Sequence, residues 1–206
     1  MKKRAKKNLG KRRFSLKDFI YLNYKLSLKT LKDTKNYIWF VSILFFLFVL
    51  LGFILPLFFQ QQILELIREL LKQTEGLDIW NMIRFIFINN LKSSFFAIFC
   101  GVLFGIVPVA ISVVNGYVLG FVANKTIASE GYLVLWRLFP HGIFELPAVF
   151  ISLGLGLRIG MMMFQHIKFK SFKNYLYEFA RIFIFVVIPL LIIAAIIEGS
   201  LISFVK

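Results

Sequence analysis

The sequence predicts an all-α fold: a polytopic membrane helix bundle with about five transmembrane helices, short or broken helices, and interfacial amphipathic helices. Apolar residues make up 59% of its 206 residues, and phenylalanine alone occurs 26 times. Soluble domains contain about 45–50% apolar residues, so a single aqueous core could not bury this surface. Several apolar runs are also long and uncharged, which is typical of membrane spans.

A basic segment, residues 1–35, begins the chain. Thirteen Lys and Arg precede Tyr37, against only Asp18 and Asp33. In a soluble protein this charge would suggest nucleic acid, but in membrane proteins positive charge collects on the cytoplasmic side, beside anionic lipids. We therefore interpret the segment as cytoplasmic, with anionic lipids and no nucleic acid as its partner. Ser15 to Asp18 fits a capping box, which predicts an amphipathic interfacial helix over residues 17–35.

The remaining residues, 36–206, form the predicted transmembrane domain. Its spans are expected at about 37–59, 91–107, 109–124, 140–160 and 182–197. The second and third spans, separated only by "GIVP", would each have roughly 15 residues, or ~23 Å of helix, which is short for a full crossing. We therefore expect a tight hairpin, which would be a re-entrant pair if neither span crosses.

Between the first two spans, "QQQILELIRELLKQTEG" (residues 60–76) has its apolar residues on one helical stripe. This segment is predicted to lie on the outer surface, against lipid or the bundle, or to receive a partner helix. Five spans place the N-terminus in the cytoplasm and the C-terminus outside. The regions assigned inside, the N-terminal segment and the loop from Arg158 to Arg181, contain 18 of the 25 Lys and Arg. This distribution predicts a multi-pass protein of the plasma membrane.

Three glycine pairs lie one helical turn apart within predicted spans. They are Gly101 and Gly105, Gly116 and Gly120, and Gly156 and Gly160. In lipid, helices associate through close backbone contact across small residues. The pairs therefore predict tight packing, within one chain by preference and otherwise between copies in a homo-oligomer. Ser112 and Asn115 are expected to form interhelical hydrogen bonds.

The segment "FPHGIFELP" carries an ionisable pair between two prolines. Pro140 suits the first position of a helix, and His141 and Glu145 then lie at i and i+4 on one face. Pro147 removes a backbone hydrogen bond inside the same helix, which predicts a kinked or broken helix. The pair should therefore face protein or a water-filled pocket rather than lipid.

Three roles remain open for His141 and Glu145. An intramembrane carboxylate near a broken helix is typical of proton relays and cation sites in transporters. The pair could instead satisfy freed backbone groups or a neighbour such as Arg137, Asn89, Asn90 or Lys92. Catalysis is the third role, but zinc needs three or four ligands, and neither a serine–histidine–acid set nor a phosphate loop is visible. Cys100, the single cysteine, excludes an intramolecular disulfide. The sequence thus predicts no enzyme, no metal and no cofactor.

Four motifs occur in a characteristic order. They are "NN" at 89–90, "FCGVLFGIVP" at 99–108, "NGYVLG" at 115–120 and "FPHGIFELPAVFISLGLGLRIG" at 139–160. From about Tyr37 to the C-terminus the chain resembles the stage II sporulation protein M family of integral membrane proteins. The positions that match the family motifs are Asn90, Gly101, Gly105, Pro108, Asn115, Gly116, Gly120, Pro140, His141, Gly142, Glu145 and Pro147.

The resemblance implies a non-enzymatic scaffold that localises cell-wall hydrolases at the membrane. In spore-forming bacteria, a member of the family works at the engulfing septum with a peptidoglycan amidase and a lytic transglycosylase. Our first hypothesis is therefore a membrane scaffold with membrane or envelope protein partners. The alternative is a channel or transporter that uses the Pro-broken helix and the His141/Glu145 pair.

Overall fold

The computed structural model describes residues 15–132, 135–163 and 169–205, and the side chains of 15–132, 142–163 and 173–202. This part of the chain is almost entirely helical, which confirms the predicted all-α class. Five of its helices are long and apolar enough to cross a membrane. The basic block at residues 2–13, His166, and the side chains of Arg137 and His141 lie outside the described residues.

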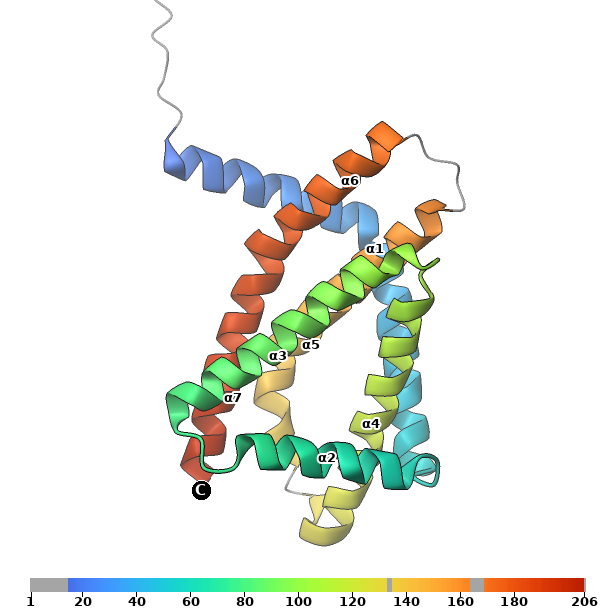
Figure 1. Cartoon of the computed structure of the whole chain (residues 1–206), viewed down its shortest axis with the longest axis vertical. Coiled ribbons are helices and arrows are strands. Elements are labelled where there is room, and N and C mark those ends of the chain that lie inside the picture. Colours follow the sequence, from blue (N-terminus) through green and yellow to red (C-terminus); the bar gives the residue numbers. More distant parts are fainter. Residues whose placement is uncertain (1–14, 133–134, 164–168, 206) are drawn as a thin grey trace, which may run out of the picture.

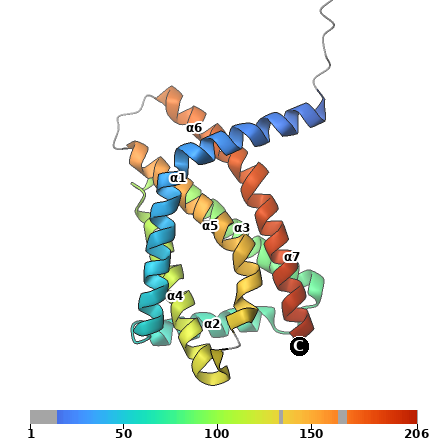
Figure 2. The ribbon, with the colours of Figure 1, turned by 180° about the vertical axis from the view of Figure 1, so that it is seen from behind.

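The helices follow one another with short connections. In order, they are α1 (Leu16–Ile54), α2 (Gln60–Thr74), α3 (Ile79–Phe99), the short turn η1 (Cys100–Val102), α4 (Ile106–Glu130), α5 (Leu135–Met163), α6 (Phe169–Ile182), the π-helical turn η3 (Phe183–Val187) and α7 (Ile188–Val205). Figures 1 and 2 show that α1 begins at one end of the bundle and that α7 ends at the other. The first half of α1 and α6 lie at the first end, and α2 crosses the second.

Helix α1 begins with the predicted capping box, which the structure confirms: the Ser15 side chain caps the first turn and Asp18 bonds back to the Ser15 N–H. The expected boundary between residues 35 and 36 falls inside this helix. Figure 1 shows that α1 first lies across one end of the bundle and then turns along it. Thr30 and Thr34 donate hydrogen bonds to carbonyls one turn earlier, an arrangement that often bends helices.

Arg158 of α5 joins this part of α1 to α6. Its guanidinium donates to the Thr34 hydroxyl at 2.7 Å and lies 5.3 Å from the centre of the Tyr175 ring. A guanidinium over an aromatic face is attracted by the ring quadrupole. One half-buried cation therefore helps to fix both elements at this end of the bundle.

The tight hairpin is present, but its two helices are longer than expected. Its two helical segments, Ile79–Val102 and Ile106–Glu130, have 24 and 25 residues, enough to cross the hydrocarbon core fully. Asp78 caps α3 by accepting from the Asn81 N–H, which starts the helix well before residue 91. The turn comes at Leu103–Gly105, where Phe104 and Gly105 have positive φ. Buried Pro108 therefore lies in the first turn of α4, where it costs no backbone hydrogen bond.

Helix α5 lies at the centre of the bundle. In its membrane-spanning window 61% of residues are buried, against 22–28% in the other four spans. Helix α5 runs from Leu135 to Met163, so Pro140 does not start it, contrary to expectation. Of the two outcomes predicted for Pro147, a kinked or a broken helix, the break is absent, and Figure 2 shows that α5 bends along its length. Neighbouring helices can stabilise proline within a membrane helix, since local adjustments satisfy the freed backbone groups.

Glycines bring α5 into backbone contact with α3 and α4. A Cβ built on Gly156 would lie 2.2 Å from the carbonyl oxygen of Ala97, and one on Gly160 would lie 2.0 Å from the backbone nitrogen of Gly105. Gly101 meets Gly156 in the same way, at 2.1 Å from its carbonyl oxygen. Real Cβ atoms essentially never approach backbone this closely, so only glycine fits at these crossings.

A second glycine interface joins α1 and α4. A Cβ on Gly116 would lie 2.4 Å from the Phe45 carbonyl oxygen, and one on Gly120 would lie 2.0 Å from that of Val49. The Ser112 hydroxyl donates to the Val41 carbonyl at 2.8 Å, which confirms its predicted interhelical bond. The Asn124 amide donates to the Phe53 carbonyl at 2.9 Å. All these contacts are within one chain.

Replacing Gly156 with Ala is expected to destabilise the protein, by about 1–3 kcal/mol as for other overpacked sites, because the new methyl group meets the Ala97 carbonyl. Gly142→Ala is the matched control on the same helix. Among the described residues, its Cβ would meet the Leu146 side chain alone, at 3.6 Å, and Ala is the better helix former. The midpoint of thermal unfolding in detergent measures the stability of both variants relative to the wild type. Equal midpoints for the two variants would contradict the packing at Gly156.

Candidate functional site

The structure places Glu145 beside a second carboxylate that the sequence analysis missed. Glu145 is half-buried on α5, and Glu198 is half-buried on α7. The two carboxyl groups are close enough to interact electrostatically. Gly199, which follows Glu198, packs against the backbone of Ile83 in α3. The pair therefore lies where α3, α5 and α7 meet, towards the end of the bundle that α2 crosses.

Glu198 is visible in the sequence as a single acid in the apolar run "IIAAIIEGSLISF". It was missed because the last span was expected to end at residue 197, whereas α7 continues to Val205. A carboxylate inside a span is costly and marks a functional site by default. Two such groups facing each other could take up a proton or bind a cation.

The other predicted site residues do not join this pair. His141 lies in α5 one turn before Glu145, but its side chain is outside those described, so their predicted contact is untested. Asn90 is half-buried on α3, and Asn115 is exposed on α4. Among the described residues, no hydrogen bond links either asparagine to Glu145, and Asn115 lacks the expected interhelical bond. Among the described atoms, a Cβ built on Gly142 would come near the Leu146 side chain of the same helix and no other group.

One buried hydroxyl also stands out on α3. Ser94 is 2% exposed, and within the described chain its oxygen finds no hydrogen-bond partner. The described residues contain no cluster of three or more His, Cys, Asp or Glu that could hold a metal ion.

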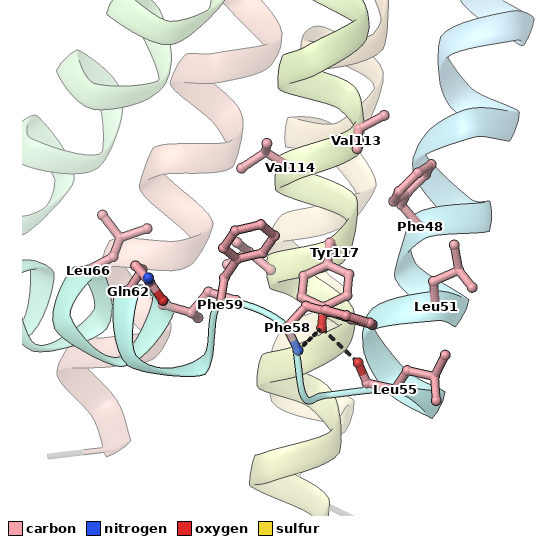
Figure 3. Close-up of a pocket in the computed structure, with 12 residues that line it drawn as sticks. Phe48, Leu51, Leu55, Phe58, Phe59, Gln62, Leu66, Val113, Val114 and Tyr117 are labelled. Carbon is pink, nitrogen blue, oxygen red and sulfur yellow. Dashed lines mark hydrogen bonds between the residues drawn. The ribbon is translucent and has the colours of Figure 1, made fainter.

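A groove lies between α1, α4 and the start of α2, near the same end of the bundle (Figure 3). It has a volume of about 530 Å³ and is lined by Phe48, Leu51, Leu55, Phe58, Phe59, Gln62, Ile63, Leu66, Val113, Val114, Tyr117 and Val118. The Tyr117 hydroxyl donates to the Leu55 carbonyl at 2.7 Å and accepts from the Phe58 N–H at 3.1 Å. Tyr117 thereby fixes the connection between α1 and α2.

Comparison with known families decides what kind of protein this is. Residues 41–201 match the family described as stage II sporulation protein M. The chain belongs to this family. The matched region contains all five spans in part or whole, the Glu145/Glu198 pair, the groove and both glycine interfaces. The match confirms the resemblance to the stage II sporulation protein M family that the sequence motifs indicated. The protein is a multi-pass membrane protein.

The chain also has an archaeal relative. The chain is 32% identical over 189 residues to the uncharacterized protein MJ0706 of Methanocaldococcus jannaschii, with 89% of this chain and 79% of the relative covered. No solved structure matches the chain.

A double-mutant cycle tests the contact between the two carboxylates. Glu145→Gln and Glu198→Gln are expected to be non-additive in unfolding free energy, with an interaction of at least about 0.5 kcal/mol, because the groups share one site. Glu145→Gln combined with Glu69→Gln on exposed α2 is the control pair, and should be additive. Additivity in both pairs, measured by unfolding in mixed detergent, would show that Glu145 and Glu198 do not interact.

Proposed function

We propose that this member of the stage II sporulation protein M family is a non-enzymatic scaffold of the cell membrane, which organises membrane or envelope proteins. Family membership supports a membrane protein of this kind, and the family resemblance suggests cell-wall hydrolases as its partners. The observation that carries the proposal is the exposed helix α2. It offers a surface for partners at the end of the bundle where α7 finishes (Figure 1).

Most of α2 is exposed, and Ile63 is its single buried residue. Leu70 and Leu71 are 38% and 62% exposed, so its apolar stripe extends beyond the bundle. Its opposite face carries exposed charges of both signs, at Glu65, Arg68, Glu69 and Lys72. An amphipathic helix with an uncovered apolar face can pack into the groove of a partner protein.

The proposed orientation places α2 on the outer side of the cell membrane. Exposed lysines gather at the opposite end of the bundle, at Lys25, Lys29 and Lys32 on α1 and at Lys173 on α6. Because positive charge favours the cytoplasmic side, that end, and the basic N-terminal segment with it, would face the cytoplasm and its anionic lipids. Helix α2 and the end of α7 would then face the cell envelope, where wall-remodelling partners act.

Transport is the second candidate, and the Glu145/Glu198 pair is the observation that favours it. Carboxylates that lie near each other on two membrane helices, as Glu145 and Glu198 do, are typical of proton and cation pathways. In this case Glu145→Gln would abolish proton or cation flux in proteoliposomes and leave assembly intact. Helix α5 continues through Pro147, so the transport candidate rests on the carboxylate pair and not on a broken helix.

Affinity purification in mild detergent from the native host tests the scaffold. Leu70→Ser with Leu71→Ser is expected to reduce a copurifying envelope protein about tenfold, the loss that corresponds to 1.4 kcal/mol of binding energy. Leu176→Ser with Tyr177→Ser on α6 is the matched control, because these residues are 38% and 61% exposed at the opposite end. The control should retain the partner.

Two results would contradict the proposal. Wild-type protein that purifies without any reproducible partner would exclude a stable scaffold complex. Equal recovery of the partner with the α2 and α6 variants would show that α2 is not the docking surface. The first result would direct the work to flux measurements with Glu145→Gln and Glu198→Gln.

A further inference from the structure

The groove between α1, α4 and α2 is not used by either candidate function. Its walls come from two membrane helices, since Phe48 and Leu51 lie on α1 and Val114 and Val118 on α4. At ~1.5 Å per residue, Phe48 lies about 9 Å from the last residue of α1. The groove therefore extends from the membrane interface into hydrocarbon depth.

We propose that this groove binds one hydrocarbon chain of a membrane lipid, with the polar linkage of that lipid at Gln62. Ten of its twelve lining residues are apolar, and the two others are Gln62 and Tyr117. The Tyr117 hydroxyl is already engaged by Leu55 and Phe58. Gln62, on the first turn of α2, is exposed, and its amide can donate to an ester or phosphate oxygen at headgroup depth.

Water does not suit the groove. A bound water molecule makes two to four hydrogen bonds to polar groups, and the lining offers one uncommitted side chain for the whole volume. A dry void is also unfavourable, because the residues that line it lose dispersion contacts. A lipid chain is apolar, is present on both sides of these helices, and supplies the missing contacts.

A partner helix is too thick for the groove. A helix with its side chains is about 10–12 Å across and rises 1.5 Å per residue, so each residue fills a cylinder slice of roughly 120 Å³. The groove volume of 530 Å³ therefore holds about one helical turn. A lipid chain is much thinner and can follow the groove along its length. The volume also falls in the range of about 300–1,000 Å³ that is typical of small-molecule sites.

The backbone at the groove's interfacial end is held in an unusual shape. Phe59 has φ 56 and ψ 26, the left-handed conformation that is uncommon for a bulky residue. This turn sends α2 across the end of the groove, and the bond from Phe58 to Tyr117 holds the turn in place. Figure 3 shows the Phe59 ring and Gln62 on the α2 side of the groove, opposite Phe48 and Leu51. Residues of α1, α4 and the start of α2 thus line the site.

Photo-cross-linking tests the proposal on the full chain in vesicles. The probe is phosphatidylglycerol with a diazirine in one acyl chain, diluted into unlabelled phosphatidylglycerol and phosphatidylethanolamine. Cross-links should concentrate about tenfold on the groove residues relative to the lipid-exposed residues Phe95, Phe96 and Phe99 of α3. Equal labelling of both faces would mean ordinary surrounding lipid, and would overturn the proposal.

Two substitutions on α4 make the result specific. Val114→Trp fills the groove and should lower its labelling about tenfold, whereas Ile106→Trp, at a 66% exposed position outside the groove, should not. Val118→Phe is a second filling variant if Val114→Trp folds poorly. Gln62→Leu should also reduce labelling, and unchanged labelling would exclude Gln62 from the site. If Val114→Trp instead dissociates an oligomer and the groove never labels, a second copy of the chain occupies it and the proposal is wrong.

Discussion

Backbone contact between α5 and its neighbours is the constraint on which the rest of the structure depends. Lipid surrounds membrane helices with material as apolar as their own side chains, so association has to come from close packing. Gly156 and Gly160 provide it, because their backbones touch Ala97 at the end of α3 and Gly105 at the start of α4. The turn between α3 and α4 therefore packs directly against the last part of α5.

The carboxylate pair, the groove and the exposed helix α2 lie towards the other end of the bundle. Where α5 leaves the glycine contacts, Glu145 meets Glu198 of α7. The α1–α4 pair is held by its own glycines, and its outer end forms the groove with α2. The opposite end is built differently: Arg158 joins α1 and α6 there, and exposed lysines surround it. The bundle therefore has one basic end and one end with a carboxylate pair, an apolar groove and an exposed helix.

The sequence predicts the class, the number of spans and the capping box at Ser15, since all three follow from local composition and spacing. It does not predict the length of α3, because Arg84 and Asn89 lower the hydropathy of the first half of this helix. In the structure these two residues are exposed, whereas Met82 and Ile86 on the same helix are buried. The sequence predicts a kink or a break at Pro147 without choosing between them, because packing against neighbouring helices determines whether the helix continues. Glycine spacing indicates close contact but cannot name the partner helix. The Glu145/Glu198 pair and the groove join residues far apart in the chain, so only the fold brings them together.

Cysteine accessibility in intact cells tests the five crossings most directly. In a Cys100→Ser background, Glu69→Cys on α2 and Ser129→Cys at the end of α4 should react with a membrane-impermeant maleimide. Leu103→Cys, in the turn after α3, and Lys173→Cys on α6 should react only after the membrane is permeabilised. Leu103→Cys that stays unreactive after permeabilisation, or that reacts in intact cells, would contradict a full crossing by α3 and α4, and with it the division of the molecule into two opposite ends.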